Sequence, residues 1–277
     1  MAQSDFHMLD LAINQDMWDR ALVSFNYTEF NKRYHIGTGF LYFINNKIFL
    51  ITAKHVISEA LESHKNVTAS FQVNKNGEYI ENPINNLKFS YLDEYDLAFA
   101  NVDEFMKSLP VYFMSGFIKY KPSTIAFRYR NDVSNLNDAF FKNNELLFGY
   151  TSVENTIPLK FNPYKFYWRT LLTEKHEENN LKCSIKSGVF LKFDKKDMIE
   201  LDNDLELKEH RASGNYPSMK GMSGGPCIRP KIRDETLIID NISGVIIELL
   251  RKPPFNEKII VIAPIEPIAD RIAHSND

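Results

Sequence analysis

Residues 37–53 read GTGFLYFINNKIFLITA, two apolar runs that meet at the pair Asn45-Asn46. Asparagine tolerates the positive backbone angles of a two-residue hairpin turn, so this stretch predicts two antiparallel strands joined at that pair. Directly afterwards, residues 55–64 (HVISEALESH) have the spacing of one or two helical turns. The hairpin and the short helix therefore set the pattern for the first part of the chain.

Other short strand-like runs follow this hairpin along the whole chain. Clear examples are VTASFQV (67–73), DLAFANV (96–102), ELLFGYTSV (145–153), TLIIDNISGVIIELL (236–250) and KIIVIAPI (258–265). No long helical pattern lies between them, and many short strands separated by turns indicate a barrel or a sandwich. Residues 265–277 predict a terminal helix with Pro267 in its first turn.

Two further segments differ from this pattern. Residues 1–30 carry apolar positions with irregular, partly helical spacing and predict an extension packed on the body. Residues 110–122 are bounded by prolines and contain Gly116, as a connector between two modules would. At 277 residues, the chain fits one compound domain of two such modules.

Composition and charge exclude several classes of function. With 44% apolar and 25% charged residues the chain is ordinary globular protein, and its net charge of -3 offers no footprint for nucleic acid. The N-terminus lacks the pattern of a signal peptide, and no apolar run is long enough for a bilayer, so we expect a cytoplasmic protein without membrane contact.

The two cysteines, Cys183 and Cys227, favour a reducing compartment. We expect free thiols, with a single bridge as the alternative, because sequence cannot place two sulfurs within bonding distance. No His, Cys and Asp cluster has ligand spacing, so neither a metal nor another cofactor is expected.

The hexapeptide Gly221-Met222-Ser223-Gly224-Gly225-Pro226 carries the strongest chemical signal. A serine nucleophile needs a nearby base and backbone N–H groups aimed at the oxyanion, and glycines let the chain expose such groups. The alternative is a glycine-rich turn whose serine makes a local hydrogen bond.

Two more residues suit the same chemistry. His55 follows a strand and opens a helical turn, where a ring can be held at the rim of a cleft. Asp96 precedes an apolar strand and can orient a histidine, although an aspartate there is often a turn residue. Asp93 and Asp103 are the substitutes if that register is wrong.

Four motifs, GTGF (37–40), TAKHV (52–56), YDLA (95–98) and GMSGGP (221–226), resemble the trypsin-like (chymotrypsin-fold) serine peptidases, in particular disulfide-poor bacterial members. The resemblance implies a mainly β protein of two six-stranded antiparallel β-barrels. Its parts would be an N-terminal extension (1–30), a first barrel (31–115), and a second barrel with a C-terminal helix (116–277).

The same match implies the role of each site residue. His55 would be the general base, Asp96 its orienting acid and Ser223 the nucleophile, in the family's order. The N–H groups of Gly221 and Ser223 would form the oxyanion hole. The pocket would be lined by residues 216–220, which include Pro217 and Ser218, and by residues 246–249, which include Ile247 and Glu248.

The chain also departs from the family. Met222 stands where digestive members have an aspartate that pairs with a new N-terminus. We therefore expect control through ordering of the loop at Lys220–Gly221 or through a regulatory protein partner. The long interval between Asp96 and Ser223 predicts insertions, within residues 131–144 and 176–186, as surface loops.

Substrate preference is the least defined feature. No aspartate occupies the position that would give basic specificity, so a small or apolar preference is expected. Glu248 adds a negative charge if it faces the pocket, and an exposed strand glutamate is the alternative.

The resemblance thus implies a serine endopeptidase that acts on a protein or peptide substrate through an acyl-enzyme, with restricted or triggered activity. An esterase with the same triad is one alternative, but the order of residues in such hydrolases fits poorly, since His274 alone follows Ser223. A catalytically silent peptide-binding module is the other alternative, usually marked by a lost triad residue.

Overall fold

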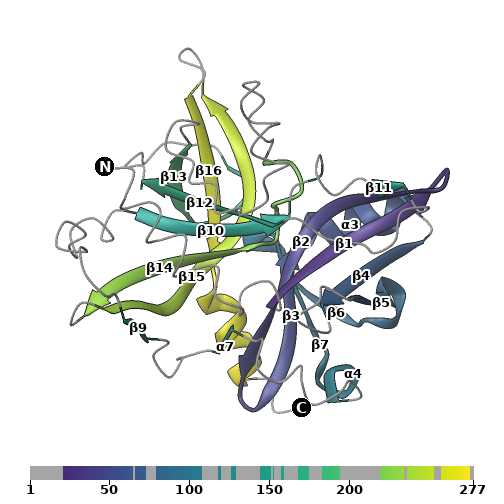
Figure 1. Ribbon diagram of the computed structural model, residues 1–277, viewed down its shortest axis with the longest axis horizontal. Helices are drawn as coiled ribbons and strands as arrows, with labels where there is room; N and C mark the ends of the chain where they lie inside the picture. The colour runs from purple at the N-terminus through teal and green to yellow at the C-terminus, as the bar shows by residue number, and fades with distance from the viewer. Residues whose placement is uncertain are drawn as a thin grey trace.

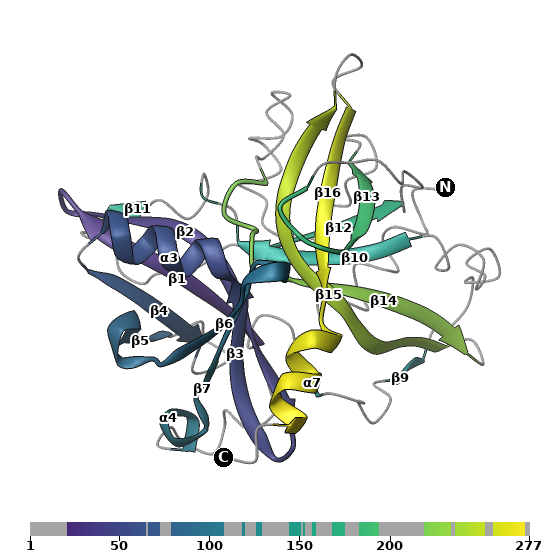
Figure 2. The same cartoon turned by 180° about the vertical axis from the view of Figure 1, so that it is seen from behind.

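The computed structural model describes residues 21–64, 66–72, 79–107, 118–119, 126–128, 144–150, 152, 157–158, 168–174, 183–193, 219–233, 236–252 and 257–274. These residues form two sheets with few helices (Figures 1 and 2). The prediction of a mainly β protein with a short C-terminal helix is confirmed.

The first sheet holds nine strands, of which seven follow the order β5-β4-β1-β2-β3-β7-β6. Their bounds are β1 Leu22–Glu29, β2 Lys32–Ile44, β3 Lys47–Ala53, β4 Val67–Gln72, β5 Tyr79–Pro83, β6 Phe89–Leu92 and β7 Leu97–Asn101. These seven strands are antiparallel to their neighbours. Two short strands from further along the chain, β8 (Ile118–Lys119, parallel) and β11 (Ile157–Pro158, antiparallel), also pair with β2.

The β2–β3 hairpin turns at the predicted asparagine pair. Asn45 and Asn46 have φ angles of 51° and 60°, so both central residues take the left-handed conformation of a type I′ turn. The pairing of Ile44 with Lys47 closes the turn, and Gly39 lies opposite Thr52. Local turn chemistry therefore fixes the register of this hairpin.

Residues 22–29, which the sequence assigned to a partly helical extension, form strand β1. This strand pairs with β2 on one side and β4 on the other. Six consecutive residues from Ala21 to Asn26 are buried, so both faces of the strand are covered. A strand covered on both faces lacks the polar and apolar alternation that identifies a strand in sequence.

The second sheet holds seven strands, six of them in the order β12-β10-β14-β15-β16-β13. Their bounds are β10 Asn144–Tyr150, β12 Trp168–Glu174, β13 Val189–Phe193, β14 Pro226–Arg233, β15 Thr236–Lys252 and β16 Glu257–Pro264. The short strand β9 (Ala126–Arg128) pairs with β15. All pairings within this sheet are antiparallel.

Helical segments are short and pack at the ends of the strands. They are α3 Lys54–Ser63, η1 Ile84–Asn86, η2 Asp93–Tyr95, α4 Asp103–Lys107 and α7 Glu266–His274. Helix α7 follows β16 but lies beside the first sheet in both views (Figures 1 and 2), where Ile272 lines a surface cavity with Phe49 and Phe99. The C-terminal helix thus links the two halves of the molecule.

One apolar core runs through both sheets. Its main cluster contains Phe25 and Phe40 from the first sheet together with Phe148, Tyr150 and Val245 from the second. At about 25 cal/mol per Å² of buried apolar surface, such a shared core holds the two sheets against each other. Residues at their junction therefore keep a fixed geometry.

Other predictions concern the thiols and the predicted loops. Cys183 and Cys227 are both free thiols, as expected. Within the described ranges, no helix is both long and apolar enough to span a bilayer. Residues 131–143 and 176–182 of the predicted insertions, and most of the predicted connector (110–122), lie outside the described residues.

Candidate active site

Strand pairing brings His55 and Asp96 together. Ala53 at the end of β3 lies opposite Leu97 at the start of β7, so the residues that follow and precede these strands are neighbours. The backbone N–H of Lys54 donates to the carbonyl of Asp96 at 2.7 Å. Asp96 ends the η2 turn with a left-handed φ of 53°, a conformation that aspartate tolerates better than most residues.

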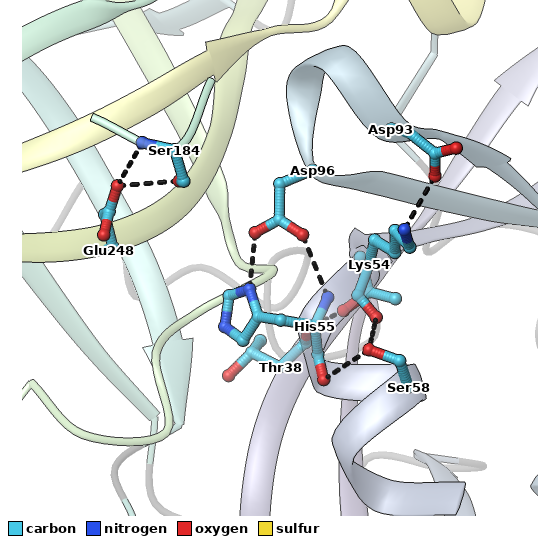
Figure 3. Close-up of polar contacts among 9 residues, drawn as sticks. Thr38, Lys54, His55, Ser58, Asp93, Asp96, Ser184 and Glu248 are labelled. Carbon is cyan, nitrogen blue, oxygen red and sulfur yellow. Dashed lines mark hydrogen bonds and ion pairs between the residues drawn. The ribbon is translucent and has the colours of Figure 1, made fainter. Parts of the chain in front are cut away.

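The Asp96 carboxylate holds His55 through both of its oxygens (Figure 3). Oδ2 lies 2.6 Å from His55 Nδ1, and Oδ1 accepts the His55 backbone N–H at 3.0 Å. A carboxylate at Nδ1 assigns the ring hydrogen to that atom and leaves Nε2 as the basic nitrogen. The first helical turn and the ring are thus fixed by one side chain.

Electrostatics keep this histidine basic. Burial lowers the pKa of His55, but the hydrogen bond and charge of Asp96 outweigh it, together with the charges of Glu59 and Glu248, and the net shift is upward. The side chains of His55 and Asp96 are 31% and 16% exposed, so the ring is open to solvent on one side. Such a histidine can exchange protons with a bound molecule.

The two substitutes named for Asp96 have other partners. The Asp93 carboxylate lies 2.7 Å from Lys54 Nζ and is largely exposed. Asp103 begins helix α4, and its backbone N–H donates to the Asn101 side chain. Of the three aspartates, only Asp96 contacts His55 in the part of the chain that the structure describes.

The loop that carries Ser223 docks on the hairpin that precedes His55. The Ser223 carbonyl accepts the backbone N–H of Thr38 at 2.9 Å. Gly224 has a φ of 88°, and a Cβ there would collide with Thr38 and Thr52, so the close approach requires glycine. Ser223 is half-buried and makes no side-chain hydrogen bond to His55 within the described residues.

Backbone N–H groups in this loop divide into two kinds. Those of Met222, Gly224 and Gly225 donate to the carbonyls of Met219, Ile246 and Met222, respectively. Those of Gly221 and Ser223 have no acceptor among the described residues. Both N–H groups therefore remain able to donate to a bound acceptor.

His35 is a site residue that the sequence analysis did not single out. Its ring is 4% exposed and lies under the nucleophile loop, with Nε2 at 2.9 Å from the Gly221 carbonyl and 3.1 Å from the Tyr150 carbonyl. Two carbonyls require a hydrogen on Nε2, so Nδ1 accepts from the Ser24 hydroxyl at 2.8 Å. Burial lowers its pKa to about 4 against the smaller opposing effect of these bonds.

Thr38 completes this junction between the two sheets. Its hydroxyl donates to the Gly221 carbonyl at 2.8 Å and accepts the Tyr150 backbone N–H at 3.0 Å. The Gly221 carbonyl is therefore held by Thr38 and His35 together, which turns it away from the site and leaves the N–H groups of the loop available. The only sequence signal was the proximity of His35 to the GTGF motif.

Of the four residues predicted to line the pocket, the structure describes Ile247 and Glu248, which differ in their exposure. Pro217 and Ser218 lie outside the described residues. The Ile247 side chain is 1% exposed and belongs to the core. Glu248 is half-buried, and its Oε1 accepts two hydrogen bonds from Ser184 (Figure 3).

Cys227, which follows Ser223 closely in sequence, has a thiol that is poorly nucleophilic. Cys227 is fully buried, and burial together with the charge of Glu145 raises its pKa well above the ordinary value. Glu145 is itself buried and binds Arg229 at 2.7 Å and the Ser243 hydroxyl at 2.6 Å. This polar network braces β10, β14 and β15.

In the comparisons with known proteins, no family model matches the chain and no curated protein matches it.

Proposed function

We propose that the chain is a serine endopeptidase with a chymotrypsin-like arrangement of two antiparallel β-barrels. The observation that carries the proposal is the docking of the Ser223 loop on the hairpin that leads into His55, beside two open N–H groups. The contact between His55 and Asp96 at 2.6 Å supplies the base that such a serine needs. The antiparallel order of both sheets is consistent with this fold.

The proposed reaction proceeds in two stages. Ser223 Oγ attacks the substrate carbonyl while His55 Nε2 takes its proton, and Asp96 stabilises the imidazolium. The N–H groups of Gly221 and Ser223 bind the oxyanion. The proton then passes to the leaving amine as the peptide bond breaks, and water hydrolyses the acyl-enzyme with His55 again as base.

Packing around Met222 supports control without an N-terminal ion pair. The side chain is 1% exposed and belongs to an apolar cluster with Leu147, Met219 and Ile246. Apolar burial can hold this loop without the charge pair that digestive members use. We propose that activity depends instead on loop order or a protein partner, and that the two free thiols reflect a reducing compartment.

A fluorophosphonate probe tests whether the serine is activated. Wild-type protein should be labelled, and Ser223→Ala should lose labelling because the attacking oxygen is gone. Ser90→Ala, which removes an exposed hydroxyl on β6, is the matched control and should be labelled normally. Persistent labelling of Ser223→Ala would contradict the assignment, and well-folded but unlabelled wild type would favour a peptide-binding module.

The substrate class needs a second experiment. Mapping new protein termini in cells that express wild type or Ser223→Ala should reveal a narrow set of cleavages that depends on Ser223. Turnover of simple esters without any cleavage of peptides or proteins would favour an esterase. Rapid, indiscriminate digestion of casein would count against restricted activity.

A further inference from the structure

A β-bulge sets the direction of Glu248 on strand β15. The pairing of β15 with β16 shifts between Ile246 and Glu248, which leaves Ile247 without a partner in that register. As a result, Ile246 and Ile247 are both buried, and they belong to different apolar clusters. Bulges beside active sites commonly re-aim a side chain, and here the residue after the bulge is Glu248.

Glu248 lies on β15 of the second sheet, near enough to His55 for its charge to act on the ring. Figure 3 shows Glu248 and Ser184 on one side of the site, with His55 and Asp96 on the other. The backbone N–H and hydroxyl of Ser184 donate to the same oxygen, Oε1, at 3.0 and 2.7 Å. Oε2 makes no hydrogen bond among the described residues and remains available.

The segment that holds Glu248 is also tied to the turn before Asp96. Lys186 donates its backbone N–H to the Glu94 carbonyl at 2.8 Å, and its Nζ lies 3.0 Å from the Glu94 carboxylate. Residues 183–188 therefore bridge β15 of the second sheet and η2 of the first. This bridge fixes the position of Glu248 relative to His55.

Charge balance distinguishes Glu248 from its acidic neighbours. Asp93 is paired with Lys54, Glu94 with Lys186, and Asp96 with His55. Glu248 makes no ion pair among the described residues, although its charge helps to raise the pKa of His55. A carboxylate beside the site that has no ion-pair partner can bind a cation that arrives with a ligand.

We propose that Glu248 is a specificity-determining residue that binds a lysine or arginine side chain of the substrate, close to the bond that is cut. This inference rests on the proposed peptidase function and names its substrate class, in place of the small or apolar preference expected from the sequence. Ser184 is a positioning residue that occupies Oε1 and directs Oε2 towards the substrate. The alternative is that Glu248 serves only to anchor residues 183–188.

Cleavage of a positional peptide library tests this proposal. Wild type should prefer lysine or arginine at one position by about tenfold, which corresponds to about 1.4 kcal/mol. Glu248→Gln should lose the preference and Glu248→Lys should reverse it towards acidic residues. Asp93→Asn removes a neighbouring carboxylate that pairs with Lys54 and takes no part in the bridge, and it should keep the wild-type profile.

The outcomes separate this inference from the proposed function. Fluorophosphonate labelling of wild type and of every variant reports whether Ser223 is active, whatever the library shows. If labelling and cleavage persist but the Glu248→Gln profile equals that of wild type, Glu248 is an anchor only and the proposal is wrong. Ser184→Ala gives a second readout that does not alter the carboxylate, and it should weaken the same preference; an unchanged profile would also count against the proposal.

Discussion

His35, which contacts the loop that carries Ser223, and His55, which follows the hairpin on which that loop docks, differ in burial, in partners and in charge. His55 has a carboxylate partner at 2.6 Å and a side chain that is 31% exposed. His35 is 4% exposed, and its partners are two carbonyls and a hydroxyl. The pKa of His55 is raised, whereas burial lowers that of His35 to about 4.

This contrast separates a histidine that can exchange a proton from one that holds a loop. A carboxylate stabilises imidazolium, and access to the site lets a proton move to and from a substrate. Burial among neutral partners keeps the His35 ring uncharged, so both of its nitrogens serve as fixed hydrogen-bonding groups. The residue type alone does not decide the role, and the partners do.

Replacement of Asp96, the partner of His55, should lower kcat and have the largest effect of the three changes. Asp96→Asn should lower kcat about 10⁴-fold, because an amide no longer fixes the Nδ1–H tautomer or stabilises the imidazolium. The measurement is turnover of the best peptide from the library. The acidic limb of the rate profile should also move to lower pH, since the main group that raises the pKa of His55 is gone.

The control for this change is Asp93→Asn on the same turn. That carboxylate is largely exposed and pairs with Lys54, so kcat should stay within about twofold of wild type. Equal losses in the two variants would mean that the turn as a whole is needed and that Asp96 has no special role. Wild-type kcat in Asp96→Asn would remove the histidine and aspartate pair from the mechanism.

Replacement of His35 should have a smaller effect, which lowers both the free energy of unfolding and kcat. His35→Leu leaves the Gly221 and Tyr150 carbonyls and the Ser24 hydroxyl without this partner, at about 1–3 kcal/mol for each buried group. We expect a total loss of about 3–5 kcal/mol in the free energy of unfolding, measured with urea. Because Gly221 is one of the three groups, kcat should fall more than KM rises.

His35→Gln keeps an amide donor near the carbonyls and should restore part of the loss in both quantities. His274→Ala on the exposed end of α7 is the histidine control and should leave both unchanged. A His35→Leu protein with wild-type kcat and reduced stability would make the residue purely structural.

Local signals in the sequence predicted much of the first sheet and little of the junction. The Asn45-Asn46 turn is decided by neighbouring residues, so the hairpin could be predicted and is confirmed. Strand β1 was misread because burial on both faces removes its alternation. The partners of His35 lie 115 and 186 residues away and are backbone carbonyls, which leave no mark in the sequence.

The site likewise contains one contact that could be predicted from the sequence and one that could not. The structure brings the predicted His55 and Asp96 into contact, because both flank strands that pair directly. The contact between Ser184 and Glu248 spans 64 residues and depends on a bulge that side-chain identity does not encode. The contact that depends on the bulge could therefore be found only in the structure.

Acidification should lower the free energy of unfolding through the titration of His35, and this effect should be the smallest of the three. The native pKa is about 4 and the ordinary value is 6.5, so between these values the unfolded chain binds the proton more readily. Native stability from this residue is therefore complete above about pH 6.5 and is lost as pH falls, by roughly 3 kcal/mol near pH 4. His55 acts oppositely, since its raised pKa gives stability that is lost as pH rises.

Urea unfolding of wild type and His35→Gln at pH 7, 6, 5 and 4.5 isolates His35, because the carboxylates titrate in both proteins. The stability of wild type should approach that of the variant as pH falls, whereas a constant difference would mean that His35 is not held neutral.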